Sequence, residues 1–307
     1  MTTPYPNGLT ADASFEIERP CVPALDAILG HAFDALDHGF VRVIDYMGDD
    51  AAVVQMARVS YGAGTETPSS DEHLIRYLMR HWHTSPFEGC EIKLHVKLPI
   101  FVARQWIRHR TANVNEYSGR YSIMSDKFYV PAGSVLAPQS KSNKQGREGG
   151  YSDSDKAVLT RCLTDTMQEA HDAYRGMIEV DGYDLARELA RTVLPLSTYT
   201  EFYWKIDLHN LLHFLRLRAD SHAQYEIRAY ADIIQALVEM WTPATYRAWV
   251  DYRRDAVTFS RMEMDALRRW IAATYLTDPE YGGSGPVYLL EGVSQRERDE
   301  FVARFKG

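Results

Sequence analysis

The segment that most constrains the fold of this chain is a run of strict alternation at residues 91–98 (EIKLHVKL). Its even-numbered positions are all apolar, and its odd-numbered positions carry charged residues or histidine. Because successive side chains of a strand point to opposite sides, this pattern predicts a half-buried strand with one face on the core. A shorter alternation at residues 40–46 (FVRVIDY) predicts a second strand in the same half of the chain.

Helical patterns flank these strands. Asp49 or Asp50 can cap a helix that runs to residue 59, and residues 69–72 (SSDE) form a capping box for the next one. That helix must end before Pro86, because the residue before a proline disfavours helical backbone angles. Its apolar residues recur at helical spacing at Leu74, Leu78, Met79 and Trp82.

The remainder of the chain is mainly helical in pattern. Pro99 suits the first turn of a short helix over residues 100–108, and helical spacing dominates from Asp155 onward. The clearest core-facing stripe consists of Leu208, Leu211, Leu212 and Leu215. We therefore expect an α+β fold, with an antiparallel sheet in the N-terminal half packed with helices and a helical C-terminal half.

The 307 residues suffice for one large domain or two small ones. We expect a peripheral lead-in with one amphipathic helix over residues 1–40, a single main domain over residues 41–254 and a charged extension over residues 255–307. Residues 133–155 are polar and rich in Gly and Ser, which predicts a mobile surface loop within the main domain.

Composition disfavours several classes of protein. Lysine and arginine number 34 against 42 acids, a net charge of −8, so the chain as a whole does not attract nucleic acid or anionic lipid. The wide spacing of the cysteines argues against a disulfide framework or a cysteine zinc site: Cys21, Cys90 and Cys162. The N-terminus does not resemble a signal peptide, and no run approaches a membrane span. We therefore expect a cytoplasmic protein with no nucleic-acid and no membrane partner.

Basic groups concentrate in residues 104–121 (RQWIRHRTANVNEYSGRY). They are Arg104, Arg108, His109, Arg110 and Arg120, against Glu116 as the only acid. Arginine is suited to bidentate capture of phosphate, and Ser118 and Gly119 add a hydroxyl and a backbone that can approach a ligand closely. The segment predicts a site for a small phosphate-bearing ligand.

Two other interpretations of residues 104–121 stay open on spacing alone. One is a solvated basic helix end that binds nothing. The other is a nucleic-acid patch, because the arginines alternate with Trp106, Tyr117 and Tyr121, although the net charge of −8 disfavours it.

Two further groups of polar residues stand out. Residues 81–88 (HWHTSPFE) lie between a helix and the best strand, where loops of functional sites are common, yet a helix stop with capping histidines explains them more simply. His209 and His213 are four apart, a spacing that can bind a metal ion, but such pairs are more often structural. Residues 221–224 (SHAQ) form a capping box, which allows a helix break after Arg218.

The basic segment resembles the signature of flavin-dependent thymidylate synthases, the ThyX family. Residues 108–110 (RHR) are followed by seven residues, then Ser118 and residues 119–121 (GRY). Further segments resemble the family in the same order, and together they span about residues 40–252: 56–60 (MARVS), 83–88 (HTSPFE), 99–106 (PIFVARQW), 191–195 (RTVLP) and 218–222 (RADSH).

The resemblance implies the fold of that family, with residues 41–254 as its catalytic domain. It implies the reductive methylation of dUMP to dTMP, a step of de novo dTMP biosynthesis. Methylenetetrahydrofolate would supply the carbon, NADPH the electrons, and FAD would carry the hydride. It also implies a homotetramer whose active sites are shared between subunits.

The resemblance further assigns residues to each ligand, and it assigns no metal site. For dUMP these are Gln105, Trp106, Ile107, Arg108, Glu116, Tyr117, Ser118, Gly119, Arg120, Arg191 and Arg218. For FAD they are Ser60, His83, Ser85, Arg108, His109, Arg110, Glu116, Asp207, Leu208, His209, His213 and His222. Arg218 is the expected catalytic residue, placed at the uracil ring to favour ionisation at N3.

The chain departs from the family pattern at a few positions. Asp207 and His213 stand where some members carry asparagine, and an anionic aspartate beside a flavin would change its electrostatics. Residues 111–113 (TAN) also differ from the commonest residues inside the signature, but they occupy spacer positions.

The residues suit flavin chemistry better than a cysteine route, in which a thiolate adds to C6 of uracil. None of the three cysteines lies in a basic motif shared with the other site residues. Arginines can stabilise negative charge on the ring while a reduced flavin delivers hydride. No His–Asp pair is arranged to activate Ser118, which we interpret as a hydroxyl that binds dUMP.

Two alternatives come from other classes. The first is a metal-dependent nucleotide phosphohydrolase, which would use His209, His213 and either His83 or Asp220. The second is a non-enzymatic nucleic-acid-binding module, for which strong, salt-dependent binding to long nucleic acid would be diagnostic.

Overall fold

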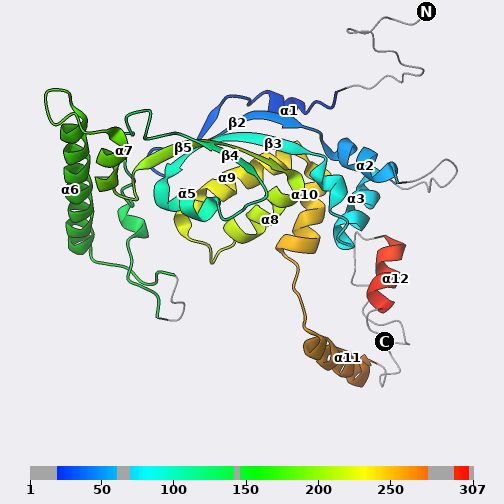
Figure 1. Ribbon diagram of the computed structural model, residues 1–307. Helices are drawn as coiled ribbons and strands as arrows, with labels where there is room; N and C mark the ends of the chain where they lie inside the picture. Colours follow the sequence, from blue (N-terminus) through cyan, green and yellow to red (C-terminus); the bar gives the residue numbers. More distant parts are fainter. Residues whose placement is uncertain (1–18, 61–69, 142–145, 276–293, 304–307) are drawn as a thin grey trace, which may run out of the picture.

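The computed structural model describes residues 19–60, 70–141, 146–275 and 294–303. In this part of the chain, five strands form an antiparallel sheet in the order β1-β2-β3-β5-β4. They are β1 (Ala32–Ala35), β2 (Gly39–Met47), β3 (Glu91–Pro99), β4 (Asn113–Glu116) and β5 (Tyr199–Asp207). Helices pack on this sheet, so the expected α+β class is confirmed (Figure 1).

The two strands predicted from alternation, β2 and β3, are present. In β3 the apolar positions are buried and the polar positions are half-exposed, as the period of two requires. A third strand, β5, corrects the expectation that the sheet comes from the N-terminal half. Its sequence also alternates, with Phe202, Trp204 and Ile206 buried, and it inserts between β3 and β4.

The helices and helical turns around the sheet account for most of the remaining described residues. Those before β5 are α1 (Pro23–Asp26), α2 (Asp50–Arg58), α3 (Asp71–Arg80), α4 (Ser85–Glu88), α5 (Ile100–Trp106), η2 (Gly133–Val135), α6 (Asp153–Ile178), α7 (Arg187–Ala190) and η3 (Arg191–Val193). Those after β5 are α8 (Leu208–Arg218), α9 (Tyr225–Trp241), α10 (Pro243–Trp249), η4 (Val250–Arg254), α11 (Arg261–Tyr275) and α12 (Gln295–Ala303). No described helix is long and apolar enough to cross a bilayer.

One face of the sheet carries the core. α5 packs there against β3 and β5, α8 against β5, and α9 against β1 and β2 (Figure 1). The predicted leucine stripe of α8 is confirmed, since Leu208, Leu211, Leu212 and Leu215 are all buried. Burying such a stripe is what holds a helix of this length on a sheet.

The ends of α3 differ from the prediction. Its N-cap is Ser70, whose hydroxyl accepts from the backbone N–H of His73, while Ser69 lies outside the described residues. The helix ends at Arg80, so Trp82 does not continue the apolar stripe. Trp82 has a φ of 62° in the left-handed region and is 62% exposed, because the chain turns there toward α4.

The segments expected to be peripheral contact the main body of the protein. β1 pairs with β2 and Leu25 of α1 is fully buried, so residues 19–40 pack onto the sheet and its core. At the other end, Glu297 of α12 approaches Arg76 and Arg80 of α3. The loop expected at residues 133–155 contains η2 and the first residues of α6, which Ser152 caps. The three-part division of the chain stays a prediction.

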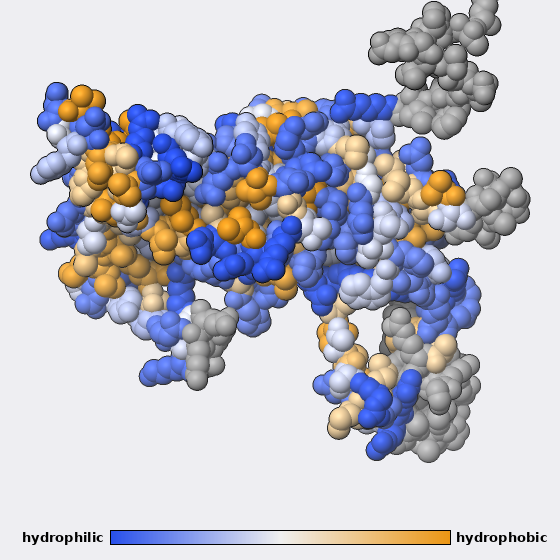
Figure 2. All heavy atoms as spheres, viewed as in Figure 1, coloured by the Kyte–Doolittle hydropathy of each residue, from blue (hydrophilic) through white to orange (hydrophobic). Residues whose placement is uncertain are grey.

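Apolar side chains are exposed at the end of the molecule that carries α6 and α7. α6 and α7 lie at one end of the sheet, and α11 and α12 lie at the other (Figure 1). Figure 2 shows apolar residues gathered on the surface at the α6 end. Exposed apolar side chains in this region include Val158, Leu189 and Leu196.

Candidate functional site

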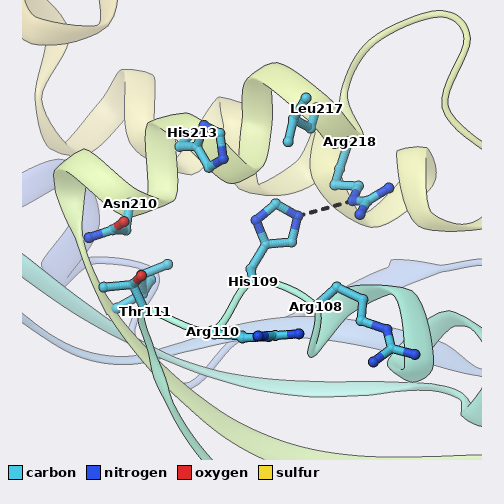
Figure 3. Close-up of a pocket in the computed structure, with 9 residues that line it drawn as sticks. Arg108, His109, Arg110, Thr111, Asn210, His213, Leu217 and Arg218 are labelled. Carbon is cyan, nitrogen blue, oxygen red and sulfur yellow. Dashed lines mark hydrogen bonds between the residues drawn. The ribbon is translucent and has the colours of Figure 1, made fainter.

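The clearest positively charged hollow, which we call the arginine cavity, lies between α8 and the residues that follow α5 (Figure 3). Its volume is about 310 Å³. It is lined by Arg108, His109, Arg110, Thr111, Ile206, Asn210, His213, Leu217 and Arg218. Three of these are arginines, and none of the lining residues in the described chain is an acid. An anionic ligand therefore suits this cavity best.

Packing of Trp106 fixes one wall of the arginine cavity. This last residue of α5 is fully buried and contacts the rings of Phe202, Trp204, Phe214 and Tyr230 at centroid distances of 4.7–6.1 Å. Aromatic contacts of this kind anchor a helix end rigidly. The residues after Trp106 therefore leave the core at a fixed point, which brings Arg108 to Arg110 to the cavity.

His109 and Arg218 face one another across the cavity. The Nε–H of Arg218 donates to Nε2 of His109 at 3.1 Å (Figure 3). Burial, and then the charges of Arg218 and His213, lower the pKa of His109 from 6.5 to about 4. His109 is therefore neutral at pH 7, with Nε2 free to accept this bond and to orient the guanidinium of Arg218.

A second hollow, which we call the serine cavity, contains the other half of the signature. Its volume is about 350 Å³. It is lined by Ile100, Glu116, Tyr117, Ser118, Gly119, Met124, Arg191, Leu194, Pro195, Leu196 and Thr200. The strand β4 connects the two cavities along the chain. Residues just before β4 line the arginine cavity, and residues from the end of β4 onward line the serine cavity.

Local contacts shape the serine cavity. Thr200 donates its hydroxyl to Oε1 of Glu116 at 2.8 Å, which orients that carboxylate. A Cβ at Gly119 would lie 2.6 Å from Sδ of Met124 and 3.3 Å from Cδ of Arg191, so any larger residue would displace these side chains. The absent side chain lets Arg191 approach the turn that carries Ser118.

The residues that line both cavities fall within a region that matches a known protein family. A profile of the family described as "Thymidylate synthase complementing protein" matches residues 42–244. A flavin-dependent thymidylate synthase of Ruegeria pomeroyi is 55% identical over 284 residues, which cover 92% of this chain and 91% of that protein. The chain belongs to the flavin-dependent thymidylate synthase family.

Two further comparisons support this family membership. The enzyme of Gluconobacter oxydans is 49% identical, covering 97% of this chain and 99% of that protein. Among solved structures, the UMP/dUMP methylase PolB of Streptomyces cacaoi, bound with 5-Br UMP, superposes with a TM-score of 0.64 at 35% identity. That match covers 72% of this chain and 97% of PolB. The metal-dependent phosphohydrolase alternative finds no support in these relatives.

The structure distributes the residues expected to bind dUMP over two places. Arg108 and Arg218 line the arginine cavity, with Gln105 and Ile107 on the same stretch of chain. The remaining polar members, from Glu116 to Gly119 and Arg191, line the serine cavity. Arg120 lies beside it and pairs with Glu188 at 3.2 Å. Trp106 differs from the rest because its side chain is in the core.

The residues expected to bind FAD are likewise divided. Arg108, His109, Arg110 and His213 line the arginine cavity, whereas Glu116 lies in the serine cavity. Others lie on neighbouring segments or in the core. Ser60 follows α2, His83 precedes α4, Ser85 begins α4, which packs on α8, Leu208 is fully buried and His209 is in the first turn of α8. His222 is exposed on the loop after α8 and pairs with Asp220 at 2.9 Å.

Asp207 has a structural task that the sequence analysis did not recognise. It is the N-cap of α8, and its carboxylate accepts from the backbone N–H and the side-chain amide of Asn210 at 2.9 and 2.8 Å. Aspartate and asparagine cap helices about equally well, so this cap does not depend on the negative charge of Asp207. The negative charge is thus directed at the helix N-terminus.

Sequence reasoning also missed several residues of the two cavities. Thr111 and Asn210 line the arginine cavity, and Thr200 and Leu196 line the serine cavity. Asn210 lies one turn before His213, a spacing that could have revealed it. The contacts of Thr200 depend on strand pairing between β4 and β5, which no local pattern indicates.

Metal ligands do not gather in the described part of the chain. No group of three or more His, Cys, Asp or Glu residues there could hold a metal ion. His209 and His213 share α8, and His213 contacts the ring of His109 at 5.9 Å instead.

Proposed function

We propose that this chain catalyses the reductive methylation of dUMP to dTMP. Methylenetetrahydrofolate is the carbon donor, NADPH the reductant and FAD the hydride carrier. The observation that carries the proposal is a cavity with three arginines, one of them oriented by a neutral histidine, in a chain whose relatives are flavin-dependent thymidylate synthases. We place the reaction in the cytoplasm, as the sequence predicts.

The donor set of the arginine cavity fits FAD. Neither Arg108 nor Arg110 has a carboxylate partner among the described residues, so both guanidiniums are free to bind the pyrophosphate. Asn210 and His213 add neutral donors on α8. When bound, FAD supplies the hydride, while the protein positions the reactants and excludes competing reactions.

Arg218 is proposed to stabilise the negative charge that develops on the uracil ring. Burial lowers its pKa from the ordinary value, yet an arginine side chain stays protonated at neutral pH. The hydrogen bond to His109 leaves the terminal nitrogens of the guanidinium free to donate to the ring. A charged donor held in advance in a partly buried site is the arrangement that electrostatic catalysis requires.

The division of dUMP ligands between two cavities supports an active site shared by subunits of a homotetramer. One cavity offers Arg108 and Arg218, and the other offers Ser118 and Arg191. Apolar residues line the serine cavity beside its polar ones, among them Ile100, Leu194 and Leu196, and Leu196 is 64% exposed. Exposed apolar residues beside a polar site are typical of a surface that another subunit covers.

Ser118 is proposed to bind dUMP through its hydroxyl and not to act as a nucleophile. Its Oγ accepts from the backbone N–H of Arg120 at 3.4 Å, and no histidine contacts it among the described residues. A Ser118→Ala variant should therefore lose dUMP affinity and keep hydride transfer at saturating dUMP. Loss of hydride transfer with unchanged dUMP affinity would contradict this role.

The proposed reaction is tested by following the oxidation of reduced flavin in the purified protein. We expect oxidation that depends on dUMP, and dTMP only when methylenetetrahydrofolate is present. A colourless protein that binds no flavin and hydrolyses nucleotides with an added metal ion would overturn the proposal.

A further inference from the structure

A chain of hydrogen bonds leads from Gln105 into the protein. The side-chain amide of Gln105, near the end of α5, donates to the carbonyl of the Gln224 side chain. Gln224 in turn donates its amide to Oε2 of Glu226 at 2.8 Å. Gln224 is the residue that precedes α9. These hydrogen bonds therefore connect the end of α5 to the start of α9, and Gln105 and Gln224 are 119 residues apart in sequence.

Glu226 fixes the direction of this chain of hydrogen bonds. It is 3% exposed, and its Oε1 receives Nη1 of Arg147 and the hydroxyl of Tyr129, both at 3.2 Å. The amide of Gln224 donates to Oε2, so the carboxylate of Glu226 accepts every one of these hydrogen bonds. Because Oε1 is occupied by two donors, Oε2 is the atom that meets Gln224.

Glu226 sets the orientation of the Gln224 amide, and Gln224 in turn sets the orientation of the Gln105 amide. Gln224 must turn its NH₂ group toward Glu226, so its carbonyl must face Gln105. Gln105 must therefore turn its own NH₂ group toward Gln224. Since the two ends of an amide point in opposite directions, the carbonyl oxygen of Gln105 is left facing away from the chain.

We propose that Gln224 and Glu226 are positioning residues that make Gln105 present a hydrogen-bond acceptor to the nucleotide. This inference rests on the proposed function and on the contact between Gln105 and dUMP that the family resemblance implies. A carbonyl oxygen selects a donor, and dUMP carries two groups of that kind, the ribose 3′-hydroxyl and the ring N3–H. Free glutamine side chains present either end, so the direction set by Glu226 adds selectivity that Gln105 alone lacks.

A double-mutant cycle tests the positioning role in the full-length, FAD-loaded protein. We expect Gln224→Met to raise the Kd for dUMP about three- to tenfold, as the loss of one directed neutral hydrogen bond predicts. The double variant with Gln105→Met should bind dUMP no more weakly than Gln105→Met alone. The matched control is Gln235→Met, the same exchange further along α9, which should leave the Kd unchanged. If the two single variants lose dUMP binding free energy in amounts that simply add in the double variant, the inference is wrong.

Glu226→Gln gives a readout that a purely structural role would not move. Arg147 and Tyr129 would hold the new carbonyl, so the new NH₂ group would face Gln224 and reverse both amides. Gln105 would then present a donor. We expect wild type to bind dUMP about three- to tenfold more tightly than an analogue lacking the donor it uses, and Glu226→Gln to lose that preference.

Two analogues identify which donor of dUMP is used. 2′,3′-Dideoxyuridine 5′-monophosphate lacks the 3′-hydroxyl, and 3-methyl-dUMP lacks the N3–H. If the preference for dUMP over both analogues is the same in wild type and Glu226→Gln, the inference is wrong. If FAD-loaded wild type does not bind dUMP at all, the proposed function fails instead. Gln224 is exposed, so Gln224→Met keeps the test open should Glu226→Gln not fold.

Discussion

Two groups of arginines in this protein differ in whether the chain supplies their counter-charges. The arginines of the arginine cavity, Arg108, Arg110 and Arg218, have no carboxylate partner in the described part of the chain. Four arginines on α3, α10 and η4, which we call the paired cluster, each have at least one. Their contacts are Arg76 with Asp251 at 2.6 Å, Arg80 with Glu300 at 2.8 Å, Arg247 with Glu72 at 2.9 Å and Arg254 with Asp255 at 2.8 Å.

The difference shows how the same side chain serves stability or ligand binding. In the paired cluster the acids come from the protein itself, and two of them, Glu297 and Glu300, lie on α12, so Arg76 and Arg80 hold α12 against α3. In the arginine cavity the charge is left for a ligand to neutralise. Counting basic residues in a sequence does not separate these cases, because most of the deciding acids are distant in the chain.

The largest effect is expected at Arg218. Arg218→Ala should lower turnover about 100- to 1000-fold, because a preorganised charged donor is lost where negative charge develops. Binding of dUMP should also weaken, while the flavin spectrum of the purified variant should remain. The rate of dUMP-dependent oxidation of reduced flavin measures the effect. Normal turnover in Arg218→Ala would show that Arg218 is not catalytic, although it has no carboxylate partner in the described part of the chain.

A smaller effect is expected at Arg191, which lines the serine cavity and has no ion pair in the described chain. Arg191→Ala should raise the Kd for dUMP about 10- to 100-fold, the range for losing a charge-assisted hydrogen bond. Titration calorimetry with dUMP measures it. The matched control is Arg247→Ala from the paired cluster, which should leave the Kd unchanged. If Arg191→Ala and Arg247→Ala lose similar affinity for dUMP, arginines without an ion pair do not differ from the paired cluster in ligand binding.

In the paired cluster the expected effect is on stability. Arg80 has a side chain only 7% exposed and contacts both Glu297 and Glu300. Arg80→Met leaves those carboxylates without their donor and should cost about 1–3 kcal/mol of unfolding free energy. This corresponds to a fall in Tm of roughly 2–10 °C. Calorimetric melting checks it, and an unchanged Tm would mean that α12 is held by other contacts.

The smallest effect concerns pH. The folded pKa of His109 is about 4, below the ordinary value of 6.5, so in this range the unfolded chain binds a proton that the folded chain does not. Its contribution to stability is present above pH 6.5 and is lost as the pH falls toward 4. We expect His109→Gln, which keeps an acceptor for Arg218, to lose less stability than wild type between pH 7 and 5, by on the order of 1 kcal/mol. Equal losses in melting experiments would contradict the burial of His109.

Local pattern predicted the parts of the fold that local forces decide. The strand β3 and the leucine stripe of α8 followed from periodicity, because burial on one side imposes it. β5 alternates as clearly as β3, and it was missed because the surrounding C-terminal half is helical in pattern. Trp82 was misplaced because helical spacing continues past Arg80, although the backbone turns into the left-handed region.

The candidate site was predictable in its members and not in its arrangement. The family signature and the separate segment 218–222 brought Arg108, Ser118 and Arg218 into one set. Its division between two cavities depends on the pairing of β4 with β5, which tertiary structure alone reveals. The contact of Gln105 with Gln224 spans 119 positions and has no local signature either.

The four-residue strand β4, which keeps the two cavities apart on one chain, has a genetic consequence. In an active site shared between subunits, a chain defective in Arg218 still carries an intact Ser118 and Arg191. A chain defective in Arg191 still carries an intact Arg218. If the active site is shared as proposed, two inactive alleles are therefore expected to complement one another when their products mix, because some sites of each hybrid assembly receive both functional halves.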